Sequence, residues 1–97
     1  MPTYIALIKL TDQGAKNIKN LPKRVRAAAR LMGKVGGKIT GFYLTMGEYD
    51  YIAIAEAPSD EVACAYLLGL GADGSLRTTT LKAFTLEEFT KIVKQLP

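Results

Sequence analysis

Four short segments of the chain are rich in apolar and β-branched residues, and segments with a helical period separate them. The strand-like segments are residues 4–10, 38–46, 49–57 and 75–84. From Val25 to Val35, apolar residues recur at steps of three and four opposite a stripe of lysine and arginine, which predicts an amphipathic helix. Further helices are predicted after Ser59 and after Thr85. The predicted order is therefore β-α-β-β-α-β-α.

Turn and capping residues mark where the helices begin and end. Asp12 is expected to cap the helical region after the first strand. Pro22 divides that region, because proline cannot occupy a helix interior without the loss of a hydrogen bond. Gly36-Gly37 ends the longer piece with a left-handed cap, and Thr85 and Glu88 form the capping box of the last helix.

This order of elements predicts an α+β fold of the ferredoxin-like type, in one domain that spans residues 1–97. Two right-handed β-α-β crossovers place the four strands in one antiparallel sheet with the spatial order 4-1-3-2. They also put both helices on the same face of the sheet. The helix after Thr85 is an extra C-terminal element.

The two strands predicted at the centre of the sheet lack a polar face. The first strand alternates Ile5 and Leu7 with Tyr4, Ala6, Ile8 and Leu10. The third strand alternates Ile52 and Ile54 on one face with Tyr51, Ala53 and Ala55 on the other. An antiparallel sheet with one covered face normally has a solvated second face, and two helices cover only one side. We therefore expect a homodimer or a higher oligomer of the dimeric α+β barrel type, with Ala53 in its interface. The alternative is that the last helix folds over the open face.

Composition narrows the possible chemistry. The chain has no histidine and one cysteine, Cys64, so neither a Ser-His-Asp nor a Cys-His arrangement is possible. A zinc site would have to use carboxylates and a single thiol, and we expect no metal and no cofactor. Cys64 lies between two alanines in an apolar helix, where a buried structural thiol is expected. The single cysteine and the absence of a spanning apolar run or a secretory start favour a cytoplasmic protein.

Positive charge is concentrated in one part of the chain. The formal net charge is +4, and eight of the thirteen lysine and arginine residues lie between Lys16 and Lys38, a stretch without an acidic residue. Such a basic helix face either is simply solvated or attracts a negatively charged partner, such as nucleic acid or an anionic surface. No aromatic residue interleaves with these charges, so a solvated face is favoured and nucleic acid is not an expected partner.

The segment Gly47-Glu48-Tyr49-Asp50 is the one cluster of carboxylates and a phenol in the chain. Glu48 and Asp50 would act as general acid and base if they were buried close together. An aspartate at a turn more often binds backbone amides, and ligand contact is the third interpretation. Arg77 begins the fourth strand and is the expected electrostatic complement, either paired with Asp50 or bound to a ligand carboxylate.

Tyrosine side chains are the other candidate ligand contacts. Tyr49 and Tyr51 are expected on one strand face, where they could line a pocket with Tyr4 and Tyr43. The alternative is ordinary packing with a satisfied hydroxyl group. The candidate ligand-binding residues are therefore Glu48, Tyr49, Asp50, Arg77, Tyr4 and Tyr43.

Five short motifs follow one another in a specific order and spacing. They are Leu10-Thr11-Asp12-Gln13-Gly14, Gly36-Gly37-Lys38, Tyr43-Leu44-Thr45-Met46-Gly47-Glu48-Tyr49-Asp50, Glu56-Ala57-Pro58 and Arg77-Thr78-Thr79-Thr80-Leu81. On these motifs the chain resembles the GYD domain family of small bacterial and archaeal proteins over nearly all of its length. The naming tripeptide has the spaced form of Gly47 followed by Tyr49-Asp50. The resemblance implies a ferredoxin-like fold and a dimeric α+β barrel, and it implies no reaction.

These observations together predict a homo-oligomeric small-molecule binding or assembly module with a pocket between the sheet and the helices. The alternative is a cofactor-independent enzyme of the dimeric α+β barrel type that uses Asp50, Tyr49 and Arg77, an interpretation that rests on analogy of fold. A nucleic-acid binder is the third possibility. The expected partners are a second copy of the chain and a small-molecule ligand, without a membrane.

Overall fold

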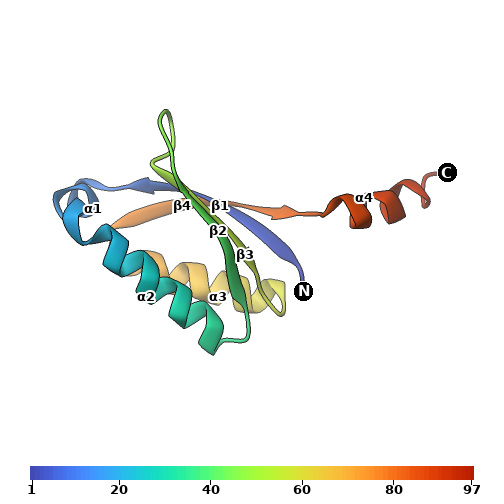
Figure 1. The fold of residues 1–97 in the computed structure, drawn as a ribbon, viewed down its shortest axis with the longest axis horizontal. Helices are drawn as coiled ribbons and strands as arrows, with labels where there is room; N and C mark the ends of the chain where they lie inside the picture. Colours follow the sequence, from blue (N-terminus) through green and yellow to red (C-terminus); the bar gives the residue numbers. More distant parts are fainter.

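The protein forms one four-stranded antiparallel sheet with its two long helices on the same face (Figure 1). This computed structural model describes all residues from Met1 to Pro97. The strands are β1 (Thr3–Leu10), β2 (Lys38–Leu44), β3 (Tyr51–Glu56) and β4 (Leu76–Ala83), in the order β2-β3-β1-β4 across the sheet. The helices are α1 (Asp12–Lys16), the 3₁₀ turn η1 (Ile18–Asn20), α2 (Leu21–Lys34), α3 (Asp60–Gly71) and α4 (Leu86–Val93). The predicted ferredoxin-like α+β arrangement and its strand order are confirmed.

The helical region after β1 is divided at the proline, as predicted. The short helix α1 is followed by η1, and Pro22 lies in the first turn of α2. The N-cap of α1 is Thr11 rather than Asp12. The Thr11 hydroxyl accepts the Gly14 amide at 3.3 Å and donates to the Gly74 carbonyl at 2.6 Å, so it ties the helix start to the segment before β4.

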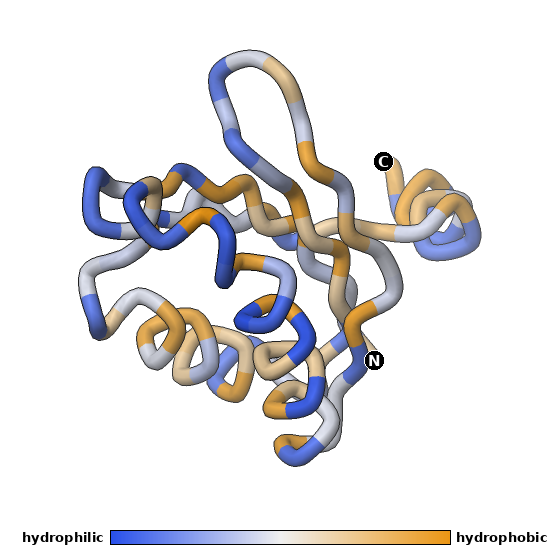
Figure 2. The backbone as a smooth tube through the Cα atoms, turned by 60° about the vertical axis from the view of Figure 1, so that its left-hand side comes forward, coloured by the Kyte–Doolittle hydropathy of each residue, from blue (hydrophilic) through white to orange (hydrophobic).

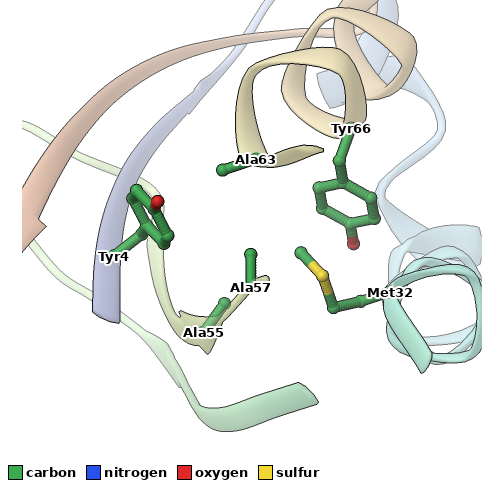
Figure 3. Packing of buried hydrophobic residues seen from close by; sticks show 6 residues of the cluster. All are labelled: Tyr4, Met32, Ala55, Ala57, Ala63 and Tyr66. Atoms are coloured by element: carbon green, nitrogen blue, oxygen red, sulfur yellow. The ribbon is translucent and has the colours of Figure 1, made fainter. Parts of the chain in front are cut away.

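The core lies between the sheet and the helices α2 and α3. Alternate residues of the strands face the helices and are buried, among them Tyr4, Ala6, Ile8, Tyr51, Ala55 and Leu76. Met32 of α2 and Tyr66 of α3 meet over these strand residues (Figure 3). Twelve of the 97 residues are buried, so the core of the isolated chain is thin.

The predicted burial of Cys64 is wrong. Helix α3 turns Ala63 and Tyr66 toward the core, and Cys64 lies outside that face with an exposed thiol. Leu68 of the same helix is also exposed. The apolar stretch of α3 is therefore wider than the face that it buries.

Strands β2 and β3 are shorter than the sequence pattern predicts, and the loop Thr45–Asp50 joins them. This loop projects beyond the body of the molecule (Figure 2). Gly47 adopts a φ of +112° within it, a conformation that residues with a side chain avoid. A bulge between Ile39 and Gly41 shifts the register of β2 against β3.

The face of the sheet that points away from the helices is uncovered. The strand register places Ile5 beside Ile54 and Leu7 beside Ile52. On the outer strands, Leu81 lies beside Ile5, and Tyr43 lies beside Ile52. We define the open face as the surface formed by Ile5, Leu7, Tyr43, Ile52, Ile54 and Leu81. Tyr43 and Leu81 are 60% and 48% exposed, so this apolar surface is in contact with solvent in the isolated chain.

Ala53 lies on the helix side of the sheet, so the prediction that places it in a sheet-to-sheet interface is wrong. Its register partner is Ala6, and both side chains line the space beneath the helices. Because side chains alternate along a strand, the neighbours Ile52 and Ile54 occupy the open face instead.

Helix α4 stands clear of the rest of the molecule and does not cover the open face (Figure 1). Thr85 and Glu88 form its capping box, as predicted, with hydrogen bonds of 3.1 and 2.8 Å. Its exposed apolar residues, spaced three and four apart, form one stripe that consists of Leu86, Phe89, Ile92 and Val93. The structure therefore has two uncovered apolar surfaces, the open face and this α4 stripe.

Helix α1 lies so close to the segment before β4 that residue 14 has no room for a side chain. A Cβ atom on Gly14 would lie 2.0 Å from the Ser75 carbonyl oxygen, whereas one on Gly33 in α2 would meet no atom within 4 Å. We expect Gly14→Ala to lower the free energy of unfolding by about 1–3 kcal/mol, and Gly33→Ala to keep it or raise it by up to about 1 kcal/mol. Urea denaturation followed by circular dichroism measures both changes. Equal effects of the two substitutions would contradict the close packing at Gly14.

Candidate functional site

Asp50 holds the β2–β3 loop against the end of β1 through backbone contacts. The Leu10 amide donates to Asp50 Oδ2 at 2.7 Å, and the Asp50 amide donates to the Ile8 carbonyl at 2.9 Å. Within the loop, the Thr45 amide donates to the Asp50 carbonyl at 3.0 Å. Of the interpretations that the sequence leaves open, the carboxylate thus has the geometry of a backbone-binding turn residue.

Arg77 approaches the loop but does not pair with Asp50. Its guanidinium donates to the carbonyl of the preceding Leu76 at 3.0 Å, and none of the ion pairs in the structure includes it. Glu48 is paired with Lys9 instead, at 3.7 Å, and the Lys9 ammonium lies 5.5 Å from the centre of the Tyr49 ring.

A shallow hollow on the surface brings several of these residues together. It has a volume of about 110 Å³ and is lined by Leu7, Lys9, Tyr49, Arg77, Thr78 and Thr79. Lys9 is the member that the sequence interpretation missed. It lies directly opposite Arg77 in the β1–β4 register. A prediction of which residues pair between these two strands would have placed Lys9 beside Arg77.

The four tyrosines of the predicted pocket do not lie together. Tyr4 and Tyr51 are buried on the helix side of the sheet, Tyr43 is exposed on the open face, and Tyr49 lines the hollow beside Lys9. The prediction that Tyr49 and Tyr51 share a strand face is wrong, because β3 begins only at Tyr51 and Tyr49 belongs to the loop.

Tyr4 instead takes part in a polar contact at the start of α3. Its hydroxyl donates to Asp60 Oδ1 at 2.5 Å, and the Lys82 ammonium donates to Asp60 Oδ2 at 3.1 Å. Burial, and then the hydrogen bond to Asp60, raise the pKa of Tyr4 to about 12. The Tyr4 and Lys82 bonds lower the pKa of Asp60, so the phenol stays neutral and the carboxylate stays charged at neutral pH.

A cavity of about 100 Å³ lies between the sheet and the helices α2 and α3. Its lining is mostly apolar and includes Ala6 and Ala53 of the sheet, Met32 of α2 and Tyr66 of α3. The Tyr66 hydroxyl donates to the Ala28 carbonyl at 2.7 Å. Burial raises the pKa of Tyr66 to about 12 and also raises the pKa of Tyr51, so both phenols are neutral at physiological pH. All three buried tyrosines, Tyr4, Tyr51 and Tyr66, line this one space.

The basic residues of α2 face solvent. Lys23, Arg26, Arg30 and Lys34 are exposed, and none of them belongs to an ion pair. Arg24 is different, because its guanidinium binds the Asp73 carboxylate at 2.6 Å and the Ser75 hydroxyl at 3.0 Å. The basic residues of α2 thus lie where a solvated helix face is expected.

With the fold and these contacts established, comparison with known proteins places the chain in a family. The model of the GYD domain matches residues 4–93, nearly the whole chain. The chain belongs to the GYD domain family. The Gly47, Tyr49 and Asp50 positions that the resemblance stressed thus lie in the loop that Asp50 anchors to β1.

Two proteins from Thermus thermophilus are similar to this GYD domain protein, one in sequence and one in fold. A protein named glutamine synthetase and cystathionine beta-lyase binding protein is 30% identical over 89 residues, which cover 91% of this chain and 94% of that protein. The solved structure of TTHA0845 covers 88% of this chain and 95% of its own, with a TM-score of 0.52 and 23% identity. The second likeness concerns the fold alone. No helix of the GYD domain protein has the length and apolar character needed to cross a membrane.

The Asp50 contacts lead to a stability prediction. Asp50→Ala leaves the Leu10 amide without its acceptor at the end of β1, so we expect the free energy of unfolding to fall by about 1–3 kcal/mol. Glu48→Ala removes only an exposed ion pair of the same loop and should change stability little. Urea denaturation of the two variants tests this difference. If Asp50→Ala is as stable as Glu48→Ala, the Asp50 carboxylate does not hold the loop.

Proposed function

We propose that this protein is a small protein-binding module that assembles with a second copy of itself through the open face, as a dimeric α+β barrel. The observation that carries the proposal is the uncovered apolar surface of the sheet. Ile5, Leu7, Ile52 and Ile54 lie side by side at its centre, and no helix of the same chain covers them. An apolar surface built from all four strands is more typical of an interface than of a solvated face.

The size of the core supports a partner for this surface. A chain of 97 residues buries a modest share of its area on folding, and only twelve of its residues are buried in the isolated chain. Sheet-to-sheet packing would remove the open face from water at about 25 cal/mol for each Å² of apolar area. A second copy offers the same apolar surface and therefore fits a self-complementary contact.

The charges at the two ends of the open face favour an antiparallel arrangement of two copies. Lys9 and Arg77 lie at the end nearest the β2–β3 loop. Glu56 lies at the opposite end and makes no ion pair in its own chain, although Lys38 is its register neighbour. A twofold axis across the strands would bring Arg77 of one copy, which makes no ion pair in its own chain, toward Glu56 of the other.

The α4 stripe is the second surface that a partner copy would cover. Helix α4 follows β4 after a two-residue connection, Phe84-Thr85, and extends beyond the end of the sheet (Figure 2). In the antiparallel arrangement this end of one copy lies over the loop end of the other. The stripe would then pack against the partner and extend the interface beyond the two sheets.

The relative from Thermus thermophilus bears a name that describes binding to two enzymes. By analogy with that name, we propose that the assembled module also binds another protein. Such a binding role requires no catalysed reaction, in contrast to the enzyme alternative. Asp50 Oδ2 accepts the Leu10 amide, so the carboxylate already has a structural role in holding the loop to β1. This role supports the protein-binding interpretation over the enzyme alternative.

The open face provides the direct test of self-assembly. Ile54→Lys places an unpaired charge at the centre of the proposed interface, so we expect a folded monomer and a dissociation constant raised about 100-fold or more. Ala65→Lys makes a similar apolar-to-lysine change on the exposed side of α3 and should leave a dimer. Light scattering after size-exclusion chromatography gives the mass of each species, and circular dichroism confirms folding.

A wild-type chain that is monomeric and fully folded at micromolar concentration would contradict the proposal. So would an Ile54→Lys variant that keeps the mass of the wild type. If instead Ala65→Lys dissociates and Ile54→Lys keeps the mass of the wild type, the interface lies on the helix side of the molecule.

The α4 stripe can be tested separately. Phe89→Asp removes an aromatic side chain from the stripe of each copy, and the loss of about 2 kcal/mol of apolar burial in each of the two copies corresponds to an association weakened about 1,000-fold. Lys91→Asp places the same side chain on the opposite side of the helix and should affect association much less. Analytical ultracentrifugation over a concentration series measures both. Equal dissociation constants for the two variants would show that α4 does not contact the partner copy.

A further inference from the structure

We infer that the cavity between the sheet and the helices is a binding site for a small, uncharged and mostly apolar molecule that forms a hydrogen bond with Thr80. The site lies on the helix side of the sheet, opposite to the open face. The inference therefore does not depend on self-assembly. It rests on the shape of the cavity, on the polar groups that face it and on the lack of free charge in its lining.

The cavity exists because small side chains face each other across the core. Ala6 and Ala53 are register partners at the centre of the sheet, and Ala28 and Ala63 approach from α2 and α3. Alanine methyl groups do not fill the distance between a sheet and a helix layer, so about 100 Å³ is left between them. An unfilled apolar space of this size lowers stability unless something occupies it.

Two hydroxyl groups of the lining lack a protein partner. Thr80 Oγ1 is fully buried and forms no hydrogen bond. Tyr51 is 5% exposed, and its hydroxyl group is absent from the hydrogen bonds that engage Tyr4 and Tyr66. A buried hydroxyl without a partner is costly, which is why almost all of them are satisfied in folded proteins. A ligand with a hydrogen-bonding group would satisfy Thr80.

The lining offers no free charge to a ligand. Arg24 is the one charged residue among the lining residues, and the Asp73 carboxylate already neutralises it at 2.6 Å. The phenols of Tyr4, Tyr51 and Tyr66 are neutral, since an ordinary phenol is protonated at neutral pH and burial raises the pKa values of these three further. Transfer of a charged ligand into such surroundings would be unfavourable. The ligand is thus uncharged, with one hydroxyl or carbonyl group.

The volume limits the size of the ligand. An engineered apolar cavity of about 150 Å³ in another protein holds benzene. The present cavity, at about 100 Å³, is smaller than that one, so a molecule of about the size of benzene is near its upper limit. Phenol and toluene are suitable probes, because they have nearly the same shape and only phenol carries a hydroxyl group.

Adjacent threonines of β4 provide a matched pair of variants. Thr80→Val removes the hydroxyl that faces the cavity, and Thr79→Val makes the same change on the opposite face of the strand. In NMR titrations with each probe, we expect Thr80→Val to weaken phenol binding about tenfold and to leave toluene binding unchanged. Thr79→Val should change neither affinity. Wild-type shifts should map to Ala6 and Ala63.

A second variant tests the space itself. Ala53→Leu fills the centre of the cavity, so we expect both probes to lose saturable binding. If Ala53→Leu does not fold, the two threonine variants still decide the question. Ile54→Lys should bind phenol as the wild type does, which separates this site from the open face.

Three results would overturn the inference. The first is the absence of saturable binding of both probes to the wild type, which would mean that the cavity holds only water. The second is an unchanged phenol affinity in folded Thr80→Val. The third is an equal loss of phenol affinity in Thr79→Val and Thr80→Val.

Discussion

The structure depends on a sheet that is apolar on both faces in a chain whose helices cover only one of them. Because side chains alternate along a strand, the residues that build the core and those that build the open face occupy neighbouring positions in β1 and β3. Helices α2 and α3 cover the first set, and the second remains in contact with solvent. The thin core and the open face both follow from having two apolar sheet faces and helices on only one of them. Helix α4 stands away from the sheet and does not cover the second face.

On the covered side of the sheet, small and bulky side chains are unevenly distributed. Alanines occupy the centre of β1 and β3, and the bulky side chains of Tyr4, Tyr51 and Tyr66 surround them. The alanine side chains are too short to fill the space beneath the helices. The space left at the centre is apolar, with the Thr80 hydroxyl as an unsatisfied polar group. The same chain thus combines an apolar surface suited to a protein with an apolar interior suited to a small molecule.

The β2–β3 loop shows that a cluster of reactive groups can have an architectural role. Asp50, the residue that would be the base of a catalytic site, receives the Leu10 amide and donates its own amide to Ile8. Glu48 and Tyr49 meet Lys9 rather than each other. These contacts join the loop to β1, and they place the hollow with Arg77 at the edge of the open face.

Sequence patterns alone determined the order of the elements, the ferredoxin-like fold, the division at Pro22 and the capping box at Thr85. Each of these depends on residues close together in the chain, where period, proline geometry and capping act locally. Only the tertiary structure decided which alternating set of strand residues the helices cover, and therefore that Ala53 faces the core. It likewise decided which side of α3 packs on the sheet, and therefore that Cys64 faces the solvent. It also decided that Tyr49 and Tyr51 separate, that Lys9 lies between Glu48 and Tyr49, and that Asp50 binds the amide of Leu10. Those outcomes depend on strand register and on contacts between residues about 40 positions apart, and a local pattern carries no information on either.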